Sequence, residues 1–159
     1  MIRKGFVIFL ALTVAAGLYA LLSSMHPSLV LMVNAFAVAV MFIAVIYGEV
    51  EGAAVGTTAG LIQDALSHSV FGIGGLSLTI AGFLAGWISR RIDVGTFYRC
   101  FVMTLAVSLM QLIIWALFYA LIFGKALLYT GPAVYLQAGF TALLSSIFIK
   151  LFKKLNPGV

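Results

Sequence analysis

Long apolar runs alternate along the chain with short polar connections. Each run approaches the roughly 20 residues that an α-helix needs to cross the apolar core of a bilayer. There are six such runs: Phe6–Ser24, Leu29–Tyr47, Gly52–Ser67, Val70–Ser89, Phe101–Phe123 and Pro132–Phe152. The third run is short and rich in Gly and Thr. The pattern predicts an all-α integral membrane protein, in which residues 1–159 form one compact bundle of six transmembrane helices.

The positions of the basic residues decide between six spans and five. With six spans and a cytoplasmic N-terminus, only Lys125 faces outward, and these residues face the cytoplasm: Arg3, Lys4, Arg90, Arg91, Arg99, Lys150, Lys153 and Lys154. Five spans would export one basic cluster, against the tendency of Lys and Arg to stay in cytoplasmic loops. We therefore expect six helices with both termini in the cytoplasm.

The composition excludes several functional classes. With 64% hydrophobic and 8% charged residues and a mean hydropathy of +1.23, the chain has no room for a catalytic or nucleic-acid-binding domain outside the membrane. The net charge of +5 reflects membrane topology and needs no acidic partner. Cys100 is the one cysteine, which rules out an internal disulfide. Without a catalytic constellation, a metal-ligand cluster or a phosphate loop, we expect no enzymatic activity and no cofactor.

A stripe of glycines marks the third run. Gly48, Gly52, Gly56 and Gly60 recur every four residues, and Asp64 takes the next step. Small residues at this spacing let two helix backbones approach closely in a membrane. The stripe either packs this helix inside its own bundle or presents part of its surface to another protein. The fourth run carries a similar pair, Gly82 and Gly86.

Asp64 belongs to a polar cluster near the outer end of the third run, which is composed of Gln63, Asp64, Ser67 and His68. A carboxylate is costly to bury in a membrane and therefore points to a specific role. Asp64 or Ser69 can cap the following helix, the cluster can bind a ligand or ion, or it can contact a partner on the periplasmic side. Gly72, with Gly74 and Gly75, predicts a flexible turn into the fourth helix.

The opposite end of the fourth run has a basic loop containing Arg90, Arg91 and Arg99. These residues follow the ordinary enrichment of cytoplasmic loops in positive charge, and they can also bind anionic lipid headgroups. Glu49 and Glu51 give the neighbouring inner loop the opposite charge. The two acids are therefore candidates for ion pairs with the basic loop.

These residues carry a family resemblance. The run Gly52-x-x-x-Gly56-x-x-x-Gly60-Leu61-x-x-Asp64, then Phe71-Gly72 and a span closing on Arg90-Arg91, resembles the rod shape-determining protein MreD. The resemblance implies an inner-membrane scaffold of the bacterial elongation machinery. Such a scaffold binds MreC, a single-pass periplasmic protein, and helps to place the peptidoglycan synthases. It also implies that the glycine stripe and Asp64 shape the fold or the partner surface.

A second resemblance implies a different function. Substrate-binding S components of energy-coupling-factor vitamin transporters are also small six-helix membrane proteins with an outward-open pocket. Their first helix carries a small-residue face, which Ala11, Ala15 and Ala20 would supply here. In that case the polar cluster around Asp64 would be the ligand site, and the bundle would have the S-component fold.

Overall fold

The computed structural model describes residues 2–26, 29, 32–67, 70–92, 94–124 and 133–155, and this part of the chain is helical with short connections. One helix lies within or across each predicted apolar run, which confirms the prediction of six helices for the described residues. The helices are α1 (Ile2–Met25), α3 (Ala35–Tyr47), α4 (Glu49–Ser67), α5 (Ile73–Arg91), α6 (Phe97–Phe123) and α7 (Ala133–Leu155).

Four of these helices are long and apolar enough to cross a membrane, namely those containing Lys4–Met25, Ile73–Arg91, Phe97–Phe123 and Leu136–Leu155. Helix α3 has only 13 residues, which corresponds to about 20 Å of a roughly 30 Å apolar core. Helix α4 has 19 residues but is less apolar than the four. The described residues therefore contain four candidate spans and two helices that need protein neighbours.

The predicted start of the second span was wrong. An unbroken helix from residue 29 was expected, but α3 begins at Ala35, and its N-cap is Asn34. The Asn34 backbone is extended, and its side chain accepts a hydrogen bond from the Ala37 amide at 3.0 Å. Such a cap satisfies an amide that has no partner within the helix, so a helix can begin inside an apolar run.

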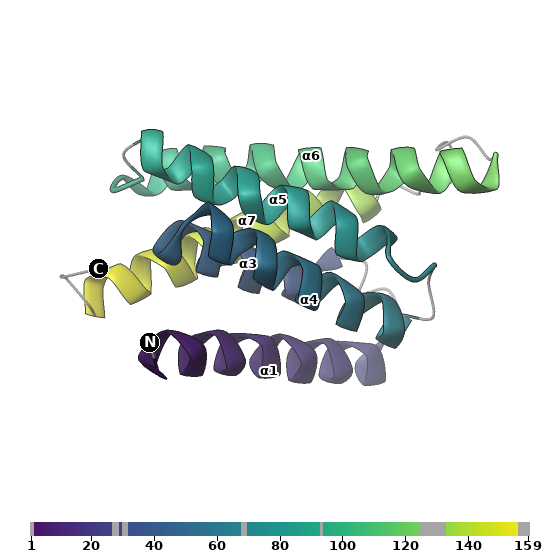
Figure 1. Ribbon diagram of the computed structural model, residues 1–159, viewed down its shortest axis with the longest axis horizontal. Coiled ribbons are helices and arrows are strands. Elements are labelled where there is room, and N and C mark those ends of the chain that lie inside the picture. Colours follow the sequence, from purple (N-terminus) through teal and green to yellow (C-terminus); the bar gives the residue numbers. More distant parts are fainter. Residues whose placement is uncertain are drawn as a thin grey trace.

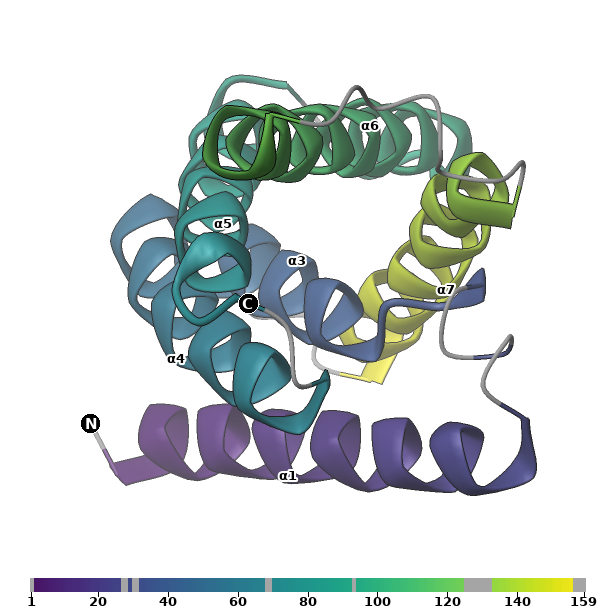
Figure 2. The ribbon, with the colours of Figure 1, turned by 90° about the vertical axis from the view of Figure 1, so that its right-hand side faces the viewer.

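Helix α3 forms the centre of the bundle. Phe36, Val40 and Ile43 are fully buried, and α3 contacts α1, α4, α5 and α7. Figure 2 shows α3 between the α4–α5 pair and α7. Because protein surrounds it, α3 does not need to match the thickness of the lipid.

Helices α1 and α6 lie at opposite edges of the bundle (Figure 1). Helix α1 contacts α3 and α4, whereas α6 contacts α5 and α7. Only 6% of the apolar window of α1 is fully buried. One face of α1, with Ile8, Leu12 and Tyr19, is partly buried against the core, and the opposite face is available to lipid or to another protein. The start of α1 and the end of α7 lie at the same end of the bundle in Figure 1, as an even number of crossings requires.

Candidate functional site

The glycine stripe of α4 lies against the backbone of α5. A Cβ atom at Gly52 would lie 2.5 Å from the Gly82 carbonyl oxygen, and one at Gly56 would lie 2.7 Å from the Leu78 carbonyl carbon. At Gly60 it would lie 2.5 Å from the Gly74 carbonyl carbon. Any side chain at these three positions would force the two helices apart, so the contact requires glycine.

The contact follows an antiparallel register. Each step of four residues forward along α4 corresponds to a step of four residues back along α5, and the facing pairs are Gly48 with Gly86, Gly52 with Gly82, Gly56 with Leu78, and Gly60 with Gly74. The α4 side has glycine at all four positions, and α5 has glycine at three of them. The stripe is thus occupied by packing inside the bundle, the first of the two roles that the sequence allowed.

Asp64 continues the stripe and caps α5. It is 2% exposed, and its carboxylate accepts hydrogen bonds from three backbone amides at the start of α5. The distances are 2.8 Å from the Gly72 amide, 3.0 and 3.2 Å from the Gly74 amide, and 3.3 Å from the Gly75 amide. These amides would otherwise lack a partner, and the positive end of the helix dipole favours a carboxylate there.

The glycines after Asp64 differ from the predicted flexible turn. Gly72 has a φ of +104°, a backbone conformation that favours glycine, and it is the N-cap of α5. Gly74 and Gly75 instead belong to the first turn of α5. A Cβ atom at Gly74 would collide with the Asp64 carboxylate. Gly74 is therefore needed because the cap approaches closely, whereas Gly72 is needed for its conformation.

The remaining members of the predicted polar cluster make fewer contacts. The Ser67 hydroxyl lies 3.5 Å from the Asp64 carbonyl oxygen, and Gln63 Oε1 is buried without a hydrogen-bond partner among the described residues. His68 lies outside the described residues. The main contact of the cluster that the structure describes is therefore the Asp64 cap. Oδ2 accepts hydrogen bonds from the Gly72, Gly74 and Gly75 amides, and Oδ1 accepts one from Gly74.

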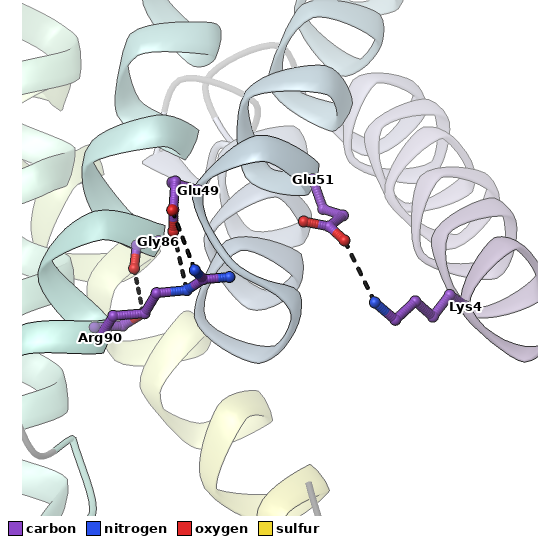
Figure 3. A network of polar contacts seen from close by, with 6 residues as sticks. Lys4, Glu49, Glu51, Gly86 and Arg90 are labelled. Carbon is purple, nitrogen blue, oxygen red and sulfur yellow. Dashed lines mark hydrogen bonds and ion pairs between the residues drawn. The ribbon is translucent and has the colours of Figure 1, made fainter. Parts of the chain in front are cut away.

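The other end of the α4–α5 contact is closed by an ion pair (Figure 3). Arg90 Nη1 donates to Glu49 Oε1 at 3.1 Å, and Arg90 Nε lies 3.0 Å from Glu49 Oε2. The guanidinium passes over Gly48, where a Cβ would lie 2.8 Å from its central carbon. Gly48 also has a φ of +110°, which makes the sharp junction between α3 and α4.

Glu51 joins the N-terminal helix to α4 (Figure 3). Lys4 Nζ lies 3.4 Å from Glu51 Oε1 and 5.4 Å from the centre of the Tyr47 ring. A hydrogen bond with its own backbone amide lowers the pKa of Glu51, and the interaction with Lys4 lowers it further. Of the two acids predicted to meet the basic loop, Glu49 pairs with Arg90, whereas Glu51 pairs with Lys4.

The basic loop residues occupy different environments. Arg91 lies over the Trp87 ring, at 4.3 Å from its centre. Arg90, Arg91 and Arg99 are all exposed, and Arg90 in addition pairs with Glu49. Headgroup binding by this loop remains a proposal, and Arg90 is used for helix packing.

The sequence did not predict the hydrogen bonds between side chains of neighbouring helices, of which two involve threonine. Thr57 Oγ1 lies 2.8 Å from Thr79 Oγ1 across the α4–α5 contact, and Thr104 Oγ1 lies 3.0 Å from Ser146 Oγ between α6 and α7. Thr57 and Thr79 each follow a residue of the glycine register, namely Gly56 and Leu78. Their positions one residue after the register could have predicted the Thr57–Thr79 bond, but only once the register of α4 against α5 was known.

Comparison with known proteins identifies one family. The family model of the rod shape-determining protein MreD matches residues 2–155, which extend from the start of α1 to the end of α7. No curated protein and no solved structure matches the chain. The expected likeness to the S-component fold therefore remains a prediction.

Proposed function

The chain belongs to the MreD family of rod shape-determining proteins, and from this premise we propose that it is an inner-membrane scaffold of the bacterial elongation complex. In this role it binds MreC, a single-pass periplasmic protein, and helps to position peptidoglycan synthases. The observation that carries the proposal is the match over residues 2–155, which is much wider than the stretch of residues 48–91 that carried the resemblance.

The family assignment by itself supports a general role without specific partners. The protein is a multi-pass membrane protein with a role in rod cell-shape determination. MreD is a shape-determining family and not a known enzyme family. MreC binding, the contact with synthases and the inner-membrane location belong to the proposal.

The engagement of Asp64 favours the scaffold over vitamin transport. A ligand site would need carboxylate oxygens that point toward a pocket. Here both oxygens of Asp64 accept hydrogen bonds from the α5 backbone. These hydrogen bonds link α4 to the start of α5, which supports a structural role for Asp64 in a scaffold.

The packing also restricts where a partner can bind. Gly52, Gly56 and Gly60 are buried against α5, so a partner helix cannot use them without separating α4 from α5. Helix α1 has large exposed apolar side chains along its length, including Phe6, Phe9 and Leu21. We place the partner surface outside the glycine stripe, with α1 as the first region to examine.

The proposal is tested by removing the gene from a rod-shaped host and restoring it on a plasmid. We expect the deletion to widen or round the cells and to disturb wall insertion, and the wild-type chain to restore both. Gly56→Leu should fail to restore shape, whereas Gly139→Leu should succeed because a Cβ there meets no atom within 4 Å. Unchanged width, shape and wall insertion after deletion would overturn the proposal.

A further inference from the structure

A groove of about 640 Å³ lies away from the α4–α5 contact, at the C-terminal end of α7. One wall is formed by the last turns of α7 and the other by the start of α6 with the connection before it. Its lining residues are Gly95, Phe97, Ile147, Lys150, Leu151, Lys153 and Lys154. Neither the family assignment nor the helix packing accounts for this groove.

The lining combines two kinds of surface. Lys150, Lys153 and Lys154 supply three positive charges within little more than one helical turn. Phe97, Ile147 and Leu151 supply an apolar wall, and each of them is 42% exposed or more. The ion pairs of the described residues involve Lys4 and Arg90 and none of these lysines. The groove therefore offers positive charge next to an uncovered apolar surface.

The position of the groove suits the edge of a membrane. Helix α7 is a candidate span that ends at Leu155, so the lysines of its last two turns lie at the level of the lipid headgroups if the helix crosses the bilayer. Tyr98, next to the groove residue Phe97, is 73% exposed, and exposed tyrosine is typical of the membrane interface. The start of α1 lies at the same end of the bundle (Figure 1).

We propose that this groove binds one anionic phospholipid. The ammonium groups of Lys150, Lys153 and Lys154 would hold the negatively charged headgroup, and an acyl chain would lie against Phe97, Ile147 and Leu151. Charge complementarity selects an anionic headgroup over a zwitterionic one, whose own cation would be repelled by three lysines. The apolar wall selects a lipid over a soluble phosphate, since only a lipid covers it.

A specific lipid site in the groove can be distinguished from general attraction between basic residues and a membrane surface. Surface attraction depends on the number of basic residues and not on their position in a groove. Two variants that remove equal charge from different places therefore give different results only if the groove is a site. Lys150→Gln with Lys153→Gln removes two charges inside it, whereas Arg3→Gln with Lys4→Gln removes two charges outside it.

The test uses the purified full-length chain in detergent, and native mass spectrometry counts bound lipids as phosphatidylglycerol or phosphatidylcholine with the same acyl chains is added. We expect one phosphatidylglycerol to bind at least tenfold more tightly than phosphatidylcholine. The variant of Lys150 and Lys153 should weaken that binding about tenfold, and the variant of Arg3 and Lys4 should leave it within twofold of the wild type.

A second variant tests the apolar wall without changing charge. Leu151→Trp should fill part of the groove and weaken phosphatidylglycerol binding several-fold, while soluble glycerol phosphate at millimolar concentration should not compete. Equal binding of the two lipids, equal loss in the two charge variants, or competition by glycerol phosphate would each overturn the proposal. Near-identical thermal unfolding of all variants confirms that each of them is folded.

Discussion

Gly56 faces the backbone of α5 at Leu78 and Thr79, and replacing it by Ala is the smallest change that tests this contact. A Cβ there would meet backbone atoms of α5, and these can move only if the whole helix shifts. We therefore expect Gly56→Ala to destabilise the purified protein by about 1–3 kcal/mol. The measurement is reversible unfolding in detergent, followed by the fluorescence of Trp87 and Trp115.

Gly139→Ala is the matched control for this prediction. A Cβ at Gly139 meets no atom within 4 Å, and Ala has a higher helix propensity than Gly by about 1 kcal/mol. This variant should be as stable as the wild type or slightly more stable. If the two glycine variants unfold at the same free energy, close packing at Gly56 is not what holds α4 to α5.

Substitution of Asp64 tests whether its carboxylate stabilises the start of α5. In Asp64→Asn the side chain keeps its size but has one carbonyl oxygen as acceptor and no charge, so part of the hydrogen bonding to Gly72, Gly74 and Gly75 is lost. We expect a loss of about 1–3 kcal/mol in the free energy of unfolding. Hydrogen exchange at the three amides should become faster, while exchange in α6 should not change.

A stable Asp64→Asn variant with unchanged exchange at these amides would contradict the capping role. Ser67→Ala is the control, because the Ser67 hydroxyl is exposed and makes only a 3.5 Å contact with the Asp64 carbonyl. We expect its free energy of unfolding to stay within about 0.5 kcal/mol of the wild type.

Several single-residue roles could be predicted from the sequence and others could not. The spacing of Gly52, Gly56 and Gly60 indicated close packing, because four-residue spacing keeps them near one face of a helix. It did not indicate the partner at Gly56, since a backbone contact leaves no signature in the residue identity of Leu78. For Asp64 the sequence allowed capping, and only the fold brings the amides of residues 72–75 to the carboxylate.

Helix boundaries show what hydropathy misses at the scale of an element. The apolar run 29–47 predicted one continuous helix, yet the Asn34 cap starts α3 at Ala35. A cap is a matter of hydrogen-bond geometry, and a single polar residue barely changes the mean hydropathy of a long run. The third run does form a helix, α4, but α4 is not among the four helices that are long and apolar enough to cross a membrane. Its hydropathy is weak because glycines, and not apolar side chains, form the face that packs against α5.

The Glu49–Arg90 ion pair links α4 to α5 beside Gly48, and a double-mutant cycle measures its strength. The Arg90 side chain is 58% exposed, so we expect a coupling of about 0.2–1 kcal/mol between Glu49→Gln and Arg90→Gln at low salt. High salt should reduce it. As a control, coupling between Glu49→Gln and Arg91→Gln should be close to zero, and equal coupling in both cycles would contradict a specific pair.

Glu51 predicts a dependence of stability on pH. Its pKa lies below the ordinary value of 4.5, so the folded state favours the ionised form and gains stability above pH 4.5. That gain is lost as the pH falls through the lowered pKa. Wild type and Glu51→Gln should therefore differ in unfolding free energy at pH 7 and converge under acidic conditions. A difference that persists below pH 3 would contradict this assignment.

At the scale of the whole molecule, the helix order predicts which ends of the bundle face each side of the membrane. In a Cys100→Ala background, an impermeant maleimide added to intact spheroplasts should label Met25→Cys and Phe71→Cys. It should not label Lys4→Cys or Tyr98→Cys until the membrane is opened. Met25, Phe71 and Tyr98 are each more than two-thirds exposed, so labelling reports the side of the membrane.

Labelling of Lys4→Cys and Tyr98→Cys from opposite sides would contradict an even number of crossings between them. Labelling of both from outside would reverse the predicted orientation. The sequence predicted the orientation from the distribution of basic residues alone. The structure adds that the start of α1 and the end of α7 lie at the same end of the bundle (Figure 1), without indicating which side of the membrane they face.

The most direct test of the scaffold is capture of the tagged full-length protein from its own host in mild detergent, with quantitative mass spectrometry of the copurifying proteins. An unrelated multi-pass membrane protein of similar size, tagged and expressed at the same level, is the control. We predict specific enrichment of a single-pass periplasmic MreC together with wall-synthesis enzymes. Enrichment of a transmembrane coupling protein with paired ATPases, and no MreC, would contradict the scaffold and indicate vitamin uptake.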